Sequence, residues 1–280
     1  MAATRKLRPG RIGRYILLVI FSAYCLLPII WFATIAVRPR TEVSVQPPIY
    51  WPHHFTLEAW NSLWSDWPVG HYLVNTATAV FGSIILDLIL AIPAAYALAR
   101  FRFRGRDDLG FYILSTRMIV PAAVAIPIFV LVKNIGLIDT PWALLLIFAA
   151  MNLSIVTWII RSYMMEIPSE IEDAAKTDGA GPVTILLALI IPLSLPGIVT
   201  AATIAMIFAV NEFLFTLLIA YTENAQTMSV GLAMFTGGSS GIIFTNIAVM
   251  SFLVFLPVLV VVYLIQGHLS RGLTMGAVKG

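Results

Sequence analysis

The chain has 280 residues, of which 60% are hydrophobic and 11% are charged, and its mean hydropathy is +0.93. Soluble domains carry roughly a quarter charged residues, so this composition excludes an ordinary soluble enzyme and indicates an integral protein of the lipid bilayer. The net charge of +3 requires no nucleic-acid partner, because membrane topology accounts for where the charges lie. The single cysteine, Cys25, excludes a disulfide framework and a cysteine metal cluster, and no metal site is predicted.

Six apolar stretches follow one another along the chain, each close to or above the roughly 20 residues that a helix needs to cross a bilayer. They predict an all-α, polytopic membrane protein with six transmembrane helices. The first stretch is too long for the apolar part of a cleaved signal peptide, so we expect it to remain as a span. The other five spans form a core over residues 72–266. In chain order the predicted spans are 15–37, 72–98, 111–132, 142–160, 186–220 and 242–265.

Lysine and arginine residues are concentrated in alternate connections, and short basic connections stay on the cytoplasmic side of a membrane. Residues 1–14, the connection after the second span, the loop 161–185 and the tail 267–280 together hold 13 of the 17 basic residues. We therefore expect both termini to be cytoplasmic. The segment 38–71 is then an external loop, in which a short helix is predicted as an interfacial anchor or as a docking site for an external partner.

The loop 161–185 contains a short polar segment that is predicted to be helical. Ser169 and Glu172 have the spacing of a capping box, which predicts the start of the helix. Gly179 can adopt the left-handed conformation that ends a helix, and Pro182 prevents its continuation. A helix of about ten residues is too short to be stable alone, so we expect it to dock on another surface.

Small and acidic side chains are arranged around this short helix. The spacing of three and four residues predicts one face made of Ile171, Ala174 and Ala175. Glu172 and Asp173 are expected to point away from that face. Small side chains let a second protein approach the backbone closely. The simplest alternative is a capped connector between two spans.

The same segment carries a pattern of residues that extends into the next span. The matching residues are Asp173, Ala174, Ala175, Gly179, Leu189, Ile191 and Pro192. Their spacing resembles the cytoplasmic coupling loop of permease subunits in binding-protein-dependent ABC importers, with Asp in place of Glu and two exchanges between Leu and Ile. In that family the loop inserts into a cleft of a separate ATPase. The resemblance implies ATPase-coupling roles for Glu172, Asp173, Ala174, Ala175, Asp178 and Gly179.

Two further stretches narrow the resemblance. Asn211-Glu212-Phe213 and the ending 272–280 are similar to the carbohydrate-uptake branch, of the maltose-permease type, with the type I permease fold. The resemblance implies a subunit of the bacterial inner (plasma) membrane that forms half of the translocation pathway of an ATP-driven sugar importer. It also implies a heterodimer with a second permease subunit, two copies of a cytoplasmic ATPase and an extracytoplasmic solute-binding protein.

The chain contains no Gly-x4-Gly-Lys-Ser/Thr phosphate loop. We therefore expect a non-catalytic subunit that binds no cofactor, with ATP and Mg bound by the partner ATPase. By the resemblance, the glycine-rich segment 231–241 would probe the ligand cleft of the binding protein, and residues 275–280 would contact the ATPase. The alternatives are that 231–241 is a passive linker and that 275–280 is a frayed tail.

Polar side chains within the spans mark a structural pair or a pathway. Asp87 and Arg117 are predicted to differ in depth by about 8 Å, which an arginine can bridge, so we expect an ion pair. Three roles stay open for Glu212: binding sugar hydroxyls, pairing with the partner subunit, or reaching water. Amides both donate and accept hydrogen bonds, which suits a polyhydroxyl solute. The predicted substrate pathway comprises Asn75, Asn152, Asn211 and Glu212.

Two other classes of function stay open. An ion-coupled secondary carrier would transport its solute without an ATPase. An intramembrane enzyme would need catalytic groups clustered at one depth, and the four histidines lie instead in loops or at the ends of spans. The sequence does not distinguish trehalose, maltose-like oligosaccharides, polyols and glycerol phosphates as the transported solute.

Overall fold

A computed structural model describes residues 9–43, 45, 49–236 and 243–275, with side chains described from residue 13 to residue 267 of these ranges. Within them every regular element is a helix, which confirms the all-α prediction. Most of the basic segment 1–14, the end of the glycine-rich segment 231–241 and residues 276–280 lie outside the described residues.

Five helices in the described part of the chain are long and apolar enough to cross a membrane, and a bent pair of helices would make a sixth span. This number agrees with the six predicted spans. The orientation of the termini stays a prediction. The five spans are formed by α1 (Pro9–Ala36), α4 (Val69–Arg100), α7 (Pro141–Glu166), α10 (Ile191–Val210) with the short elements before it, and α13 (Phe244–Met275).

The third predicted span is broken, and its two halves meet at an angle of 95°. Val120 has an extended backbone at the break, because the ring of a following proline disfavours helical geometry. Pro121 then starts the second half. The predicted span over 111–132 therefore corresponds to a pair of helices that is interrupted before Pro121, and not to one continuous helix. The pieces are α5 (Arg106–Ser115), η1 (Thr116–Met118) and α6 (Pro121–Asn134).

The fifth predicted span, 186–220, also differs from the structure. Its continuous helical part ends at Val210, and a three-residue break separates it from a further short helix. At its other end, one turn is π-helical just before Pro192, whose missing N–H cannot join a regular helical ladder. The short elements are α9 (Pro182–Ile185), the π-helical η2 (Leu186–Ile190), α11 (Leu214–Ile219) and α12 (Met228–Ala233).

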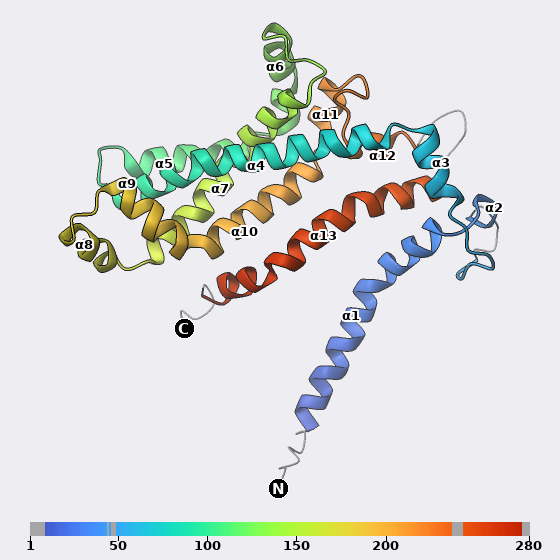
Figure 1. The fold of residues 1–280 in the computed structure, drawn as a ribbon, viewed down its shortest axis with the longest axis horizontal. Helices are drawn as coiled ribbons and strands as arrows, with labels where there is room; N and C mark the ends of the chain where they lie inside the picture. The colour runs from blue at the N-terminus through green and yellow to red at the C-terminus, as the bar shows by residue number, and fades with distance from the viewer. Residues whose placement is uncertain (1–8, 44, 46–48, 237–242, 276–280) are drawn as a thin grey trace. The chain divides into compact units, whose positions relative to one another are not determined.

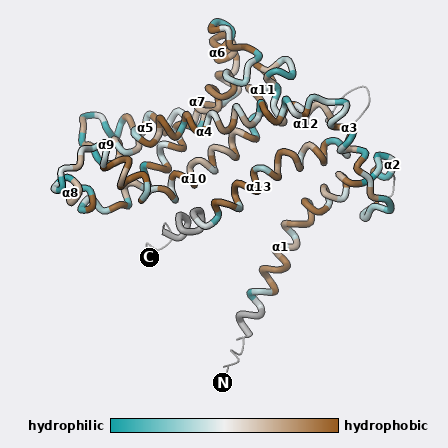
Figure 2. The backbone as a smooth tube through the Cα atoms, in the orientation of Figure 1, coloured by the Kyte–Doolittle hydropathy of each residue, from teal (hydrophilic) through white to brown (hydrophobic). Residues whose placement is uncertain are grey.

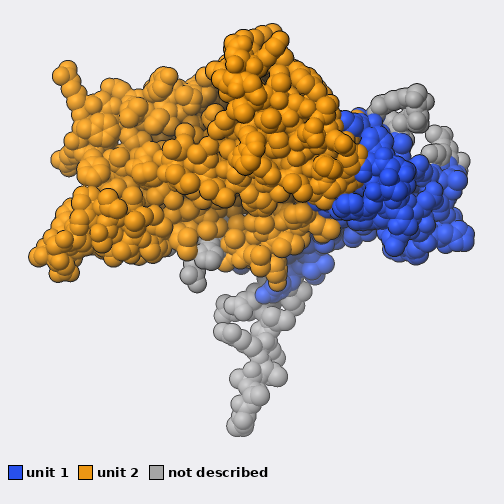
Figure 3. Space-filling view, turned by 45° about the horizontal axis from the view of Figure 1, so that its top comes forward, with its two compact units in different colours: residues 1–67, 234–253 blue, residues 68–233, 254–280 orange. Residues whose placement is uncertain are grey.

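The chain divides into two compact units (Figure 3). Unit 1 comprises residues 1–67 and 234–253 and holds α1, α2 (Arg40–Val43), α3 (Glu58–Asp66) and the start of α13. Over residues 13–30 the side chains of α1 are exposed, as expected for a helix in contact with lipid, whereas Ile35 and Ala36 at its end are buried. The predicted short helix of the 38–71 loop is α3, and the hydroxyl of Thr56 accepts a hydrogen bond from the Glu58 N–H at 3.1 Å.

Unit 2 comprises residues 68–233 and 254–280, and its centre is the packing of α4, α7 and α10 (Figure 1). Small buried side chains such as Ala79, Ala91 and Ala201 line these contacts, because membrane helices associate through close packing of small residues. Arg161 of α7 donates to the Leu98 carbonyl oxygen at 3.4 Å, so the C-terminal ends of α4 and α7 lie together.

Hydropathy separates the spans from the polar connection that follows α7. Figure 2 shows hydrophobic residues along α4, α7 and α10 and hydrophilic residues around α8 (Ser169–Thr177). The chain thus places its short polar helix at one end of an apolar bundle, where the functional prediction lies.

Candidate functional site at helix α8

The C-terminal end of α8 is a Schellman motif. Gly179 has a φ of +85°, and its N–H donates to the Lys176 carbonyl oxygen at 3.0 Å. The next N–H, of Ala180, donates to the Ala175 carbonyl oxygen at 2.9 Å. These are the two bonds that define the motif, so the prediction that Gly179 ends the helix is confirmed. The helix has nine residues, close to the ten predicted.

The N-terminal end of α8 differs from the prediction. The N-cap residue is Pro168, and no side chain caps the helix, so the predicted capping box between Ser169 and Glu172 is not formed. The reason is that the Glu172 carboxylate binds stronger donors, the side chains of Tyr96 and Arg100, on the side of α8 that faces the bundle. Glu172 is turned toward the bundle and is 3% exposed.

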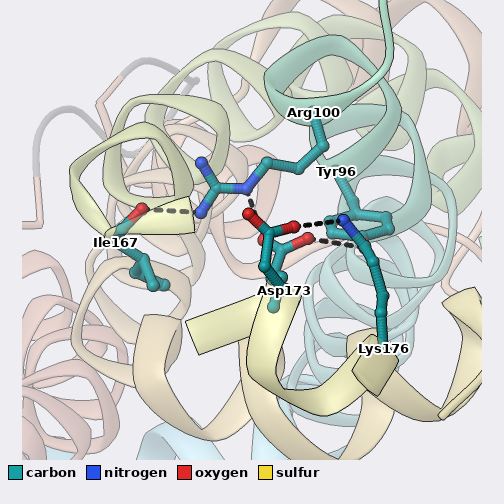
Figure 4. Close-up of polar contacts among 6 residues, drawn as sticks. Tyr96, Arg100, Ile167, Asp173 and Lys176 are labelled. Atoms are coloured by element: carbon teal, nitrogen blue, oxygen red, sulfur yellow. Dashed lines mark hydrogen bonds and ion pairs between the residues drawn. The ribbon is translucent and has the colours of Figure 1, made fainter. Parts of the chain in front are cut away.

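Two side chains from the last turns of α4 bind the Glu172 carboxylate. The hydroxyl of Tyr96 donates to Oε2 at 3.1 Å, and Nε of Arg100 donates to Oε1 at 2.5 Å. Nη2 of Arg100 also donates to the carbonyl oxygen of Ile167, at 2.7 Å. Figure 4 shows Arg100 between Ile167 and the helix that carries Asp173. A carboxylate with charge-assisted bonds on both oxygens is held firmly in one orientation.

The outward side of α8 carries most of the other predicted coupling residues. Asp173, Ala174, Asp178 and Gly179 are exposed, whereas Ala175 is half-buried against the core of unit 2. Of the predicted face, Ile171 and Ala174 are exposed, whereas Ala175 at its edge is turned partly toward the bundle. Glu172 and Ala175, three residues apart, form the inward face, and the sequence pattern did not reveal it because the inward group is polar.

Lys176 and Asp173 form a second ion pair on the outward side, with Nζ and Oδ1 2.9 Å apart. Both side chains are exposed, so the pair contributes little to stability. The hydrogen bond from Lys176 to Asp173 raises the pKa of the lysine. Lysine is charged at neutral pH with or without this bond, so the outward side carries both charges there.

Sequence reasoning missed Tyr96 and Arg100. Arg100 was counted only as one of the basic residues that indicate orientation. A usable signal was present, because Tyr96 and Arg100 are four residues apart and therefore share a face of α4. Their partner Glu172 is separated by more than 70 residues in the sequence, and no pattern shows such a contact.

The residues of the predicted substrate pathway have separate structural partners. Asn75 donates to the carbonyl oxygens of Glu223 and Gln226, at 2.8 and 3.0 Å. The side chain of Asn211 is exposed and donates to the Ile207 carbonyl oxygen of its own helix at 2.7 Å. Asn75 thus holds the segment before α12 against α4, and binding of a solute by these residues stays a prediction.

Glu212 and Asn152, the other two residues of the predicted pathway, lie in two different environments. The Glu212 carboxylate accepts hydrogen bonds from the N–H groups of Phe215 and Thr216, at 3.0 and 3.2 Å. It therefore caps the start of α11. Asn152 is buried in α7, and its Oδ1 has no hydrogen-bond partner among the described residues.

The predicted ion pair between Asp87 and Arg117 is not formed. Asp87 is fully buried in α4, and neither of its carboxylate oxygens has a hydrogen-bond partner in the described part of the chain. Arg117 lies in η1 at the break of the third span, where it donates to the Met151 carbonyl oxygen at 2.8 Å and covers the ring of Phe208. The break redirects Arg117 into an apolar cavity of about 820 Å³ between α6 and α7.

Comparison with known families places this geometry in context. Residues 88–275 match the family described as the binding-protein-dependent transport system inner membrane component. The chain belongs to this family. It is therefore a multi-pass inner-membrane component of a transport system. The family match begins in α4 and includes α8 and both partners of Glu172, so the site lies within the family's shared region.

Curated relatives of this inner-membrane component cover nearly all of it. The trehalose transport system permease protein SugB of Mycobacterium tuberculosis is 33% identical over 92% of this chain and 93% of its own length. The trehalose/maltose transport system permease protein MalG of Thermococcus litoralis is 29% identical over 94% of each chain. Matches over more than nine-tenths of the chain include its central α8 segment.

Solved structures agree with the fold. A chain of a bacterial ABC transporter involved in the import of the acidic polysaccharide alginate has a TM-score of 0.77 with this chain, at 25% identity, and the match covers 96% of this chain and 99% of that one. The alginate transporter in complex with a pentasaccharide-bound periplasmic protein has a TM-score of 0.68 at 15% identity, covering 95% of each chain. The chain therefore has the fold of an ABC importer permease.

Proposed function

We propose that this chain is the permease subunit of an ATP-driven carbohydrate importer, and that α8 is its contact with a separate ATPase. The proposed contact with an ATPase is supported by the difference between the two sides of α8. The inward side is bound to the bundle through Glu172, whereas Asp173, Ala174 and Asp178 are exposed. An exposed helix without bulky side chains at its centre suits insertion into a cleft of another protein.

The carbohydrate class rests on the relatives. Permeases named for trehalose and for trehalose/maltose match over more than nine-tenths of this chain, and the matching solved structure comes from an importer of alginate. An ion-coupled carrier or an intramembrane enzyme is not favoured, because the family is one of permeases that work with a binding protein.

The partners follow from the same proposal. A second permease subunit would complete the translocation pathway, two ATPase copies would bind ATP and Mg, and an external solute-binding protein would deliver the solute. A solved relative of the same fold is complexed with a periplasmic protein that holds a pentasaccharide, which supports this kind of partner. In the mechanism we propose, closure of the ATPase pair displaces α8 and so exposes the pathway alternately to the two sides.

Ala174→Glu tests the contact, with Ala174→Ser as its matched control. Position 174 is exposed, so either side chain changes the stability of the chain itself by only about 0.5 kcal/mol or less. Glutamate adds bulk and charge to the centre of the contact, where a misplaced charge costs several kcal/mol. We expect the ATPase to be lost from the purified Ala174→Glu complex and retained with Ala174→Ser.

The measurement is the ratio of ATPase to permease after affinity purification from membranes, followed by ATP hydrolysis in nanodiscs. Gly179→Asp is a less decisive variant, because the positive φ of Gly179 would strain the helix end as well as block a contact. Full recovery of an active ATPase with Ala174→Glu would show that α8 is not the contact.

A further inference from the structure

Helix α8 is attached to the bundle mainly through one buried carboxylate. In this helix, all of whose residues are described, Glu172 alone is buried and Ala175 is half-buried. A helix of nine residues is not stable in isolation, so these contacts decide its position. The residues that bind Glu172 therefore hold α8 in place.

The binding residues come from the last turns of a long span. Arg100 is the final residue of α4, and its guanidinium binds two acceptors at once: the Glu172 carboxylate and the Ile167 carbonyl oxygen. Tyr96, one turn earlier on the same face, donates to the other oxygen of Glu172. One side chain of α4 thus joins this span both to α8 and to the connection that precedes it (Figure 4).

The link is shielded and has a fixed geometry. The side chains of Arg100 and Glu172 are 15% and 4% exposed, so water and salt compete weakly with the ion pair. The planar guanidinium presents its donors at fixed angles, and loss of either partner would leave a buried charge unpaired, which is strongly unfavourable. A displacement of α8 is therefore expected to move the end of α4 with it.

We propose that Tyr96, Arg100 and Glu172 form a mechanical link that passes displacement of α8 to span α4, with Arg100 as the positioning residue. This inference rests on the proposed function, in which α8 meets an ATPase. It separates two roles within one short helix. Asp173 and Ala174 face outward toward the ATPase, whereas Glu172 faces inward and transmits the movement.

The test follows the movement of α4 directly. In a Cys25→Ser background, which removes the single native thiol, reporter cysteines replace in turn the exposed α4 residues Val74, Ala77 and Phe81. The purified importer complex in nanodiscs is labelled with N-ethylmaleimide, with and without ATP and vanadate. We expect trapping to change the labelling rate at least threefold at one or more of these positions.

Arg100→Gln should abolish that change while the ATPase stays bound and still traps vanadate, because Tyr96 and Ala175 still hold α8 against the bundle and its outward side chains are unchanged. Arg100→Lys keeps the charge but cannot bind both acceptors in the same geometry, so an intermediate response is expected. Arg104→Gln is the matched control: it removes an exposed arginine of the connection that follows α4 and should leave the response intact.

Three results would overturn the link. They are an unchanged labelling response in Arg100→Gln, loss of the ATPase from that complex, and no response of α4 to trapping in the unsubstituted chain. Loss of the ATPase would show that the pair only shapes the docking surface. The proposed function fails separately, if the unsubstituted chain does not retain an ATPase at all.

Discussion

At Gly197 of α10, the packing of two spans depends on the absence of a side chain. A Cβ added at Gly197 would overlap Cβ, Cγ and Cδ2 of Tyr163 in α7. Rotation of the Tyr163 ring cannot relieve the overlap with its Cβ, which is fixed to the backbone of α7. Gly197→Ala should therefore push the two helices apart, next to the connection that carries α8.

The expected cost of Gly197→Ala is about 1–3 kcal/mol, the usual range for an extra methyl group forced into a packed interior. For a chain of this size that cost corresponds to a fall in Tm of roughly 2–10 °C. Thermal unfolding of the purified subunit in detergent, followed by circular dichroism, measures it. Gly70→Ala is the control, because Gly70 lies in α4 with nothing near its added Cβ, and an alanine there should stabilise the helix by about 0.5–1 kcal/mol.

A second variant separates the overlap from other effects of alanine. In a Tyr163→Ala background the overlaps with the ring atoms disappear while the overlap with Cβ remains. The cost of Gly197→Ala should therefore fall but not vanish. Equal stability of Gly197→Ala and the unsubstituted chain would refute the close approach of α7 and α10 at this point.

Two further predictions concern the polar contacts at the other end of unit 2. Asp139 accepts hydrogen bonds from the N–H and the hydroxyl of Thr222, at 2.9 and 2.6 Å. Asp139→Ala should therefore lower the free energy of unfolding by about 1–3 kcal/mol, and Asp139→Asn should lower it by less. Thermal unfolding measures both effects. Glu212→Ala removes the acceptor for the N–H groups of Phe215 and Thr216, so it should lower the stability by about 1 kcal/mol without changing the KM for uptake of the transported solute. A raised KM would assign Glu212 to the solute instead of to the cap.

The sequence predicted the short polar helix α8 because the residues that indicate it lie next to one another in the chain. The turn at Gly179 follows from the freedom of glycine to adopt a positive φ, and the polar composition of the segment excludes it from the bilayer. The orientation of Glu172 was not accessible, because a carboxylate near the start of a helix is equally compatible with a cap and with a distant donor. Arg100 is the donor that decides between them.

The breaks in the third and fifth spans illustrate the same difference between what local sequence signals predict and what tertiary contacts decide. An apolar run predicts that a segment can cross a membrane, because its transfer free energy depends on composition. It does not predict whether the segment is straight, and the 95° bend before Pro121 moved Arg117 away from Asp87 toward the carbonyl oxygen of Met151. A prediction of depth from residue counting fails once the helix changes direction.

The sequence by itself determined the membrane environment, the helical class, the number of spans and the polar helix between two of them, since hydropathy, turn residues and charge act over a few neighbouring residues. Only the tertiary structure decided which side chains meet: Glu172 with Arg100 and Tyr96, and Gly197 with Tyr163. Such contacts depend on how the spans pack against one another, and that arrangement is set by the shapes of whole helix faces, which no short stretch of sequence records.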